Sequence, residues 1–178
     1  MKNSMNLSVA LALVTCLAAC GEGSSAGGNT NDTTTAAPAA QPLPLGQAGV
    51  ADGLDFTVTG VATPSQIGPA GVGPKAEAGE TFVVVSYTIK NTADKPLPLM
   101  ERPGLELVDS NGQTYAPDDL ASPVAAGMMD DPTGMVADLN PNVSAKTKAA
   151  WKIDKAAFDK ATWKLVLGSD PQLTFALK

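Results

Sequence analysis

Residues 81–90, TFVVVSYTIK, decide the fold that we predict for this chain. β-Branched and aromatic residues run through this stretch, which is typical of a β-strand. Both of its faces carry apolar side chains, so we expect it in the middle of a sheet that is covered on its two sides. One face carries Val83, Val85, Tyr87 and Ile89, and the other carries Phe82, Val84, Ser86 and Thr88.

Residues 143–153 alternate with a regular period of two, which predicts a half-buried strand with a solvated lysine face. Further strands are predicted at 54–59, 163–167 and 173–177. Residues 104–115 predict a hairpin, because the Asn-Gly pair in it tolerates positive φ. The inward positions of 143–153 are Val143, Ala145, Thr147, Ala149, Trp151 and Ile153, and the outward ones are Ser144, Lys146, Lys148, Ala150 and Lys152.

These segments make seven or eight short strands with Gly- and Pro-rich connections, which favours an all-β, immunoglobulin-like antiparallel β-sandwich. Only residues 154–161 have helical character. The connections 63–80 and 116–138 are long, and such loops in a compact domain are usually functional or disordered. The predicted core comprises Phe56, Val83, Val85, Tyr87, Ile89, Leu107, Trp151, Ile153, Leu165 and Leu167.

Four short motifs, in this order, resemble a bacterial lipoprotein family described only as a domain of unknown function, with a telokin-like immunoglobulin fold. Asn142 stands where that family commonly has glycine, and asparagine is the next-best residue for a left-handed turn. The resemblance implies a sandwich on the cell surface, and it implies no known activity or catalytic residues. The motifs are GLDFTV at 53–58, GETFVVV at 79–85 followed by IKNT at 89–92, LVDSNGQTY at 107–115, and LNPN at 139–142.

The N-terminal residues predict export and a lipid anchor. Residues 1–19 combine Lys2 with an apolar stretch that is too short to cross a membrane, as in a signal peptide. The sequence LAACG at 17–21 resembles a bacterial lipobox, whose cysteine is lipidated and becomes the mature N-terminus. We therefore expect the protein to be extracytoplasmic and anchored to the bacterial cell membrane by lipidated Cys20. Cys16 is a poorer alternative, because threonine precedes it.

The predicted lipidated Cys20 begins a segment, 20–48, that is rich in Gly, Ser, Thr, Asn, Ala and Pro and has no aromatic residue. Such a composition cannot bury enough apolar surface to become ordered, so we expect a flexible linker. All eight aromatic residues lie beyond it. We therefore place the sandwich domain at 49–178, which is long enough to form a core of its own.

Composition excludes several classes of function. The chain has 12 Lys+Arg against 18 Asp+Glu, which disfavours nucleic acid as a partner. It has no histidine, and both cysteines lie at or before position 20, so histidine-based triads and cysteine chemistry in the domain are excluded. The Gly-rich stretch at 68–75 lacks the Gly-Lys-Ser/Thr ending of a phosphate-binding loop. We expect a protein that is not an enzyme and carries no cofactor.

The 116–138 connection contains the candidate binding residues. Hard cations such as Ca²⁺ take several carboxylate oxygens, so its acids form a candidate metal site, and a solvated acidic loop is the alternative. Its methionines and a leucine predict an apolar contact with a partner, and thioethers also suit Cu(I). The acids are Asp118, Asp119, Asp130 and Asp131, with Asp138 nearby, and the apolar residues are Leu120, Met128, Met129 and Met135.

Two functions remain open on this basis. The first is a membrane-anchored, extracytoplasmic and non-enzymatic module that binds a protein or an envelope polymer through its long loops. The second is a surface protein that binds Ca²⁺ through the acidic 118–138 loop.

Overall fold

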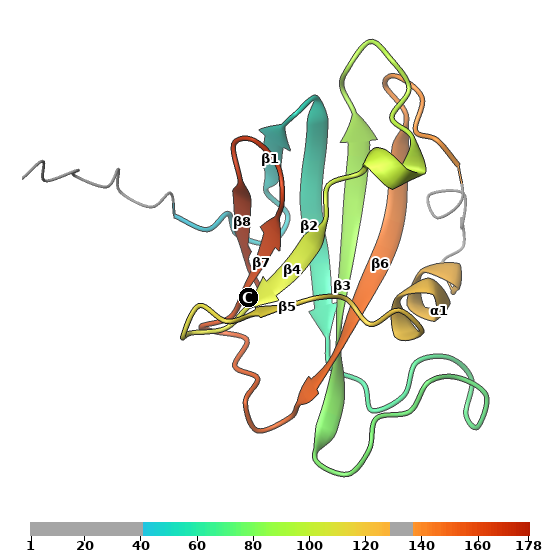
Figure 1. Cartoon of the computed structure of the whole chain (residues 1–178), viewed down its shortest axis with the longest axis vertical. Coiled ribbons are helices and arrows are strands. Elements are labelled where there is room, and N and C mark those ends of the chain that lie inside the picture. Colours follow the sequence, from blue (N-terminus) through green and yellow to red (C-terminus); the bar gives the residue numbers. More distant parts are fainter. Residues whose placement is uncertain (1–40, 129–136) are drawn as a thin grey trace, which may run out of the picture. The chain divides into compact units, whose positions relative to one another are not determined.

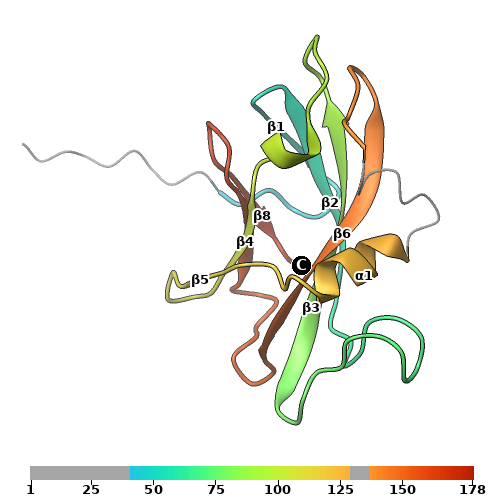
Figure 2. The ribbon, with the colours of Figure 1, turned by 45° about the vertical axis from the view of Figure 1, so that its right-hand side comes forward.

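The structure, a computed structural model of the chain, describes residues 41–128 and 137–178. In these residues, eight strands form two four-stranded antiparallel sheets, so the predicted β-sandwich is confirmed (Figures 1 and 2). The first sheet has the order β1 (Ala48–Ala51), β2 (Leu54–Ala62), β3 (Glu80–Asn91), β6 (Ser144–Asp154). The second has the order β5 (Thr114–Tyr115), β4 (Leu105–Val108), β7 (Lys164–Leu167), β8 (Leu173–Ala176).

Strand β3 lies between β2 and β6, as its two apolar faces predict. Its inward side chains Val83 and Val85 are fully buried between the sheets. On the outer face, Phe82 and Val84 belong to a second, smaller core with the 63–80 connection and the helix α1 (Ala121–Gly127). The apolar residues on both faces of this strand thus correctly indicated that the sheet is covered on both sides.

Strand β6 pairs with β3 along its whole length, and its alternation is largely confirmed. Trp151 and Ile153 are buried on the inner face, while Lys146 and Lys152 are exposed on the outer one. Ala150 departs from the predicted solvated face, because it is buried in the second core with residues of α1.

The main core lies between the two sheets, and nine of the ten predicted core residues are buried in it. The tenth, Tyr87, is only partly buried, and its ring stacks on Phe56 at a centroid distance of 4.8 Å. Tyr87 therefore packs with one side of its ring on the core and leaves another part accessible.

The 116–138 connection is not a loop throughout, since α1 forms within it. Ala121 and Ala125 lie one turn apart and pack against Phe82 and Val84. Pro123 is tolerated because it sits in the first turn, where its missing N–H has no partner inside the helix. The Pro- and Gly-rich composition concealed this helix, which depends on the sheet that it covers.

The predicted helical character at 154–161 is wrong, because this segment forms turns. The Asp154 carboxylate accepts a hydrogen bond from the Ala156 N–H, and Asp159 does the same for Ala161, both at 2.8 Å. Aspartate side chains that bond the backbone two residues later favour turns over helices.

The ordered sandwich begins before position 49, inside the segment that we assigned to the linker. Leu43 forms a parallel bridge with Phe175, and its N–H and C=O bond Thr174 and Ala176 at 2.8 Å. Strand β1 then pairs with β2 through a tight turn at Asp52 and Gly53, both with positive φ. Positive φ at both central residues is the geometry of a type I′ hairpin, which Asp-Gly favours.

Candidate functional site

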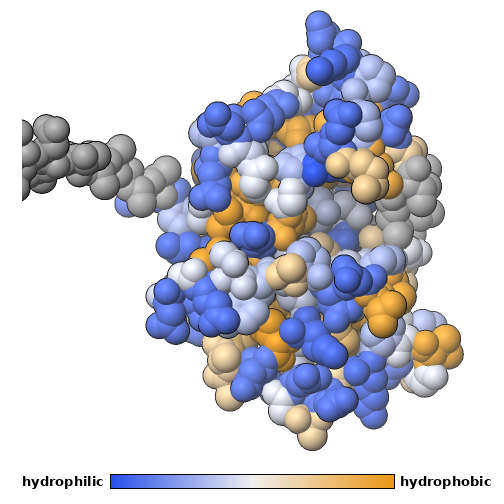
Figure 3. Space-filling model, in the orientation of Figure 1, coloured by the Kyte–Doolittle hydropathy of each residue, from blue (hydrophilic) through white to orange (hydrophobic). Residues whose placement is uncertain are grey.

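A cleft of about 320 Å³ opens at the side of the sandwich where the second sheet stops short of β6. Strand β5 has only two residues, so the inner face of β3 and β6 is covered there by two connections instead of a strand. Figure 3 shows this face hollowed below the 3₁₀ turn η1 (Leu99–Glu101). We call this the Tyr87 cleft, and its lining comprises Tyr87, Leu99, Arg102, Pro103, Leu105, Pro117, Ser122, Pro123, Ala126, Thr147, Lys148 and Ala149.

One wall of the Tyr87 cleft is the connection from β3 to β4, and Asn91 holds it in place. Asn91 is 1% exposed, and its Nδ2 donates to the carbonyls of Lys95 at 2.8 Å and Leu139 at 2.7 Å. Its Oδ1 accepts a hydrogen bond from the Ala93 N–H at 2.9 Å. Leu97 and Leu139 then exchange two backbone hydrogen bonds. This network fixes the wall before it reaches η1.

The opposite wall is formed by Pro117 and α1, which lie along the free edge of β6. The Asp118 N–H donates to the Ala150 carbonyl at 2.7 Å, and the Ser122 hydroxyl bonds both the N–H and the C=O of Ala150 at 3.0 Å. These contacts satisfy edge groups of β6 that a neighbouring strand would otherwise pair. The helix is thereby fixed beside β6, as Figures 1 and 2 show.

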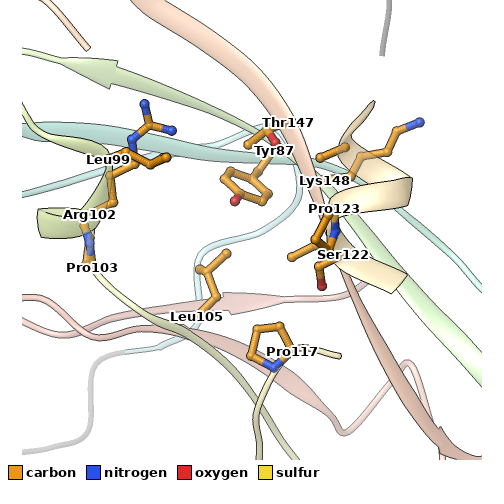
Figure 4. Close-up of a pocket in the computed structure, with 12 residues that line it drawn as sticks. Tyr87, Leu99, Arg102, Pro103, Leu105, Pro117, Ser122, Pro123, Thr147 and Lys148 are labelled. Atoms are coloured by element: carbon orange, nitrogen blue, oxygen red, sulfur yellow. The ribbon is translucent and has the colours of Figure 1, made fainter. Parts of the chain in front are cut away.

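The floor carries two hydroxyl groups, on Tyr87 of β3 and Thr147 of β6, which are direct partners in the antiparallel ladder. Thr147 is 6% exposed, and both side chains line the cleft. Neither hydroxyl forms a hydrogen bond to any residue in the described ranges 41–128 and 137–178. In Figure 4 the Tyr87 hydroxyl points into the cleft, while Lys148 extends away from it. Neither oxygen is fully buried, so water reaches both of them on the floor of the cleft.

Only two of the side chains that line the Tyr87 cleft are charged, those of Arg102 and Lys148. Burial raises the pKa of Tyr87 to about 12, against an opposing effect of the nearby Arg102 charge. Tyr87 is therefore neutral at pH 7 and can both donate and accept. Burial lowers the pKa of Arg102, and Tyr87 and Asp138 oppose that shift. Arg102 stays charged, as arginine does in proteins, and its Nη2 donates to the Ala137 carbonyl at 2.6 Å.

Sequence reasoning missed Tyr87 and Thr147 as functional candidates, although their signal was present. Each is a side chain with a hydroxyl group at an inward position of an otherwise apolar strand face. We expected them simply to face the core. The cleft itself was invisible in the sequence, because it depends on where the second sheet ends.

Of the predicted metal ligands, Asp118 has a structural role. Its Oδ1 accepts hydrogen bonds from the N–H groups of Leu120 at 3.0 Å and Ala121 at 2.7 Å, at the start of α1. Asp119 is exposed, and Asp138 lies across the cleft at η1, where it accepts a hydrogen bond from the Leu99 N–H. No group of three potential ligands is found among the residues that the structure describes. Asp130 and Asp131 lie outside those residues.

We expect Asp118→Ala to lower the free energy of unfolding by about 1 kcal/mol, because α1 loses the side chain that bonds its first N–H groups. Thermal melts of both proteins should be the same with and without millimolar Ca²⁺. A Ca²⁺-dependent rise in Tm that Asp118→Ala removes would contradict this and favour the metal site.

Of the predicted contact residues, two lie within the described part of the chain and two lie outside it. Leu120 is 76% exposed at the start of α1, and Met128 is 54% exposed at its end. Met129, Met135 and the predicted lipidation site Cys20 lie outside the described residues. Among the residues described, no helix is long and apolar enough to cross a membrane.

One family model matches most of the chain, and the similar proteins are described as uncharacterized or hypothetical. The family model described as "Domain of unknown function (DUF4352)" matches residues 43–171. The uncharacterized protein YxkC of Bacillus subtilis (strain 168) is 38% identical over 117 residues. That match covers 65% of this chain and 65% of the relative, so the chain spans less than two thirds of the relative's length.

Two solved structures are similar over most of the chain. A conserved hypothetical protein from Bacillus anthracis has a TM-score of 0.59 at 25% identity, over 75% of this chain and 94% of that one. An uncharacterized β-sandwich protein from Clostridium difficile 630 has a TM-score of 0.54 at 14% identity, over 78% of this chain and 95% of that one. The sandwich fold is thus shared with these structures, and the chain belongs to the DUF4352 family of domains of unknown function.

Proposed function

We propose that this protein is a non-enzymatic binding module, held at the outer face of the cell membrane by lipidated Cys20, and that its ligand occupies the Tyr87 cleft. The observation that carries the binding role is the pair of unpartnered hydroxyls on the cleft floor. Both oxygens remain accessible to water, so a ligand that enters between the apolar walls can bond them directly.

The anchoring role is supported by the order of the segments. A lipobox at 17–21 precedes a linker that reaches Leu43, the first residue bonded to the sandwich by a bridge. A flexible linker of this length has an end-to-end distance of roughly 25 Å. Two acyl chains on one cysteine anchor stably where a single chain is marginal. The module would thus reach partners close to the membrane.

We expect Cys20→Ala to release the protein from the membrane fraction. Without the thiol, no thioether link to diacylglycerol can form. Fractionation followed by immunodetection measures this, and Cys16→Ala is the matched control, which should remain membrane-bound. If the Cys20→Ala protein stays in the membrane fraction, or if Cys16→Ala is released, the proposed anchor is wrong.

The binding role is tested by photo-crosslinking in intact cells. A benzophenone amino acid at Pro123 places the reactive group at the rim of the Tyr87 cleft. The same group at Val72, which is 79% exposed in the 63–80 connection, is the control. We expect a specific adduct from position 123 and none from position 72. Equal adducts at both positions, or none at either, would contradict a ligand in this cleft.

A further inference from the structure

We infer that the ligand of the Tyr87 cleft is an uncharged peptide segment that inserts one aliphatic side chain and hydrogen-bonds the hydroxyls of Tyr87 and Thr147. This inference rests on the proposed binding function and adds the chemical class of the ligand. It is argued from the size, the walls, the charge and the floor of the cleft.

Size and walls favour a small, partly apolar occupant. The volume of about 320 Å³ lies at the low end of ligand pockets, which span roughly 300–1,000 Å³. Leu99, Leu105 and the rings of three prolines form most of the walls. Proline has little conformational freedom to lose, so such walls are ordered before the ligand arrives. A sugar would bring hydroxyls against these apolar walls and leave them unpaired, at a cost in free energy.

Charge favours a neutral occupant. Arg102 is the charged side chain closest to Tyr87 in the wall, and Asp138 balances it from the same side. The other cation in the lining, Lys148, extends away from the cleft (Figure 4). A carboxylate ligand would gain little from these groups and would lose its hydration on entering an apolar cleft.

The two hydroxyl groups on the floor lie close together, so a ligand can hydrogen-bond both of them at one place. Because Tyr87 and Thr147 are directly opposite each other in the ladder, their Cβ atoms lie roughly 5 Å apart. Each hydroxyl donates one hydrogen bond and accepts others. A peptide group presents one donor and one acceptor beside its side chain, so it can bond this pair while the side chain contacts the walls. Thr147 is 6% exposed, so the chain already covers most of this side chain around its accessible hydroxyl.

The test uses the mature chain, residues 20–178 with Cys20→Ser, and three probes in two-dimensional ¹H–¹⁵N NMR. The probes are N-acetyl-L-leucine methylamide, N-acetyl-L-leucine, which carries a carboxylate at pH 7, and methyl α-glucopyranoside. We expect the methylamide to shift the amide signals of residues around Tyr87, Thr147 and Ala149. The free acid should bind at least about 5-fold more weakly, and the glucoside should cause no shifts.

Two variants connect the binding to the hydroxyls. Tyr87→Phe and Thr147→Val should each weaken binding of the methylamide by about 3- to 10-fold, which is the range for one lost hydrogen bond. Their Tm should stay equal or rise, because neither hydroxyl has a partner to lose among the described residues. A merely structural role would lower the Tm instead. Thr88→Val, on the opposite face of β3, is the matched control and should leave binding unchanged.

Each of the remaining outcomes contradicts either the proposed class of ligand alone or the proposed binding function as well. Preferential binding of the acid overturns the neutral class, and binding of the glucoside alone overturns the peptide class. In both cases a binding module remains. Absence of any probe binding, with a crosslink retained at position 123, also overturns the peptide class only. Absence of both probe binding and crosslink overturns the proposed binding function as well.

Discussion

Replacing Trp151 with alanine should lower the free energy of unfolding by about 3–5 kcal/mol, the largest effect that we expect from a single substitution in the core. Trp151 is completely buried in the second half of β6, where it packs between the sheets. Its Nε1 also donates to the Tyr115 carbonyl at 2.9 Å, which ties β5 to the opposite sheet. The variant therefore loses both a large packed surface and a connection between the layers.

Urea unfolding followed by far-UV circular dichroism measures this loss independently of tryptophan fluorescence. Trp151→Phe separates the two contributions, because it keeps most of the ring volume and leaves the Tyr115 carbonyl without its donor. We expect it to lower the free energy of unfolding by about 2 kcal/mol. Val50→Ala, at a position 63% exposed, is the control and should change it by less than about 0.5 kcal/mol. A loss below about 1 kcal/mol for Trp151→Ala would contradict this packing.

Asn91→Ala should lower the free energy of unfolding by about 3 kcal/mol, equivalent to roughly 10 °C in Tm. The substitution leaves two carbonyls and one N–H without the partners that the buried amide supplied. Because the same amide orders the wall that leads to η1, the variant should also lose binding in the Tyr87 cleft. Asn140→Ala removes an exposed amide in the adjacent turn and should change the free energy of unfolding by less than about 0.5 kcal/mol.

The near-isosteric Asn91→Asp gives a pH-dependent version of this test. Its carboxylate would face the carbonyls of Lys95 and Leu139, which raises the pKa of the new group in the folded state. A group whose folded pKa is raised binds protons more tightly in the folded state, so its stability is highest at low pH and falls as pH rises through that pKa. Melts between pH 4 and 8 check this sign. A variant that is more stable at pH 8 than at pH 4 would contradict the two carbonyl contacts.

Features that depend on neighbours in the chain could be predicted well. The alternation in residues 81–90 and 143–153 located β3 and β6, because side chains in a strand alternate between faces with a period of two. Turn chemistry was equally local: Gly112 and Asn142 have φ of 83° and 62°, as their places in the predicted turns require. The Asp52-Gly53 pair carried the same signal, and β1 could have been found from it.

Features that depend on distant partners were predicted poorly or not at all. The 154–161 segment is a different kind of error, because two aspartates stabilise turns by bonding the backbone only two residues later. The α1 segment contains proline, yet it is helical because Ala121 and Ala125 are buried on the outer face of β3 and β6. For α1 the outcome depends on contacts that a local pattern does not contain.

The sequence by itself determined every described strand except β1, their inward and outward faces, most of the core and the motifs of the family, because these follow from short-range periodicity and turn chemistry. The predicted anchor at Cys20 also comes from the sequence alone, because it rests on a contiguous motif. Only the tertiary structure decided that the second sheet ends at the two residues of β5, that Asn91 and Ser122 hold two connections apart at that end, and that Tyr87 and Thr147 face a cleft there. The physical reason is that a cleft is an absence of packing, and packing is settled by residues that are far apart in the chain.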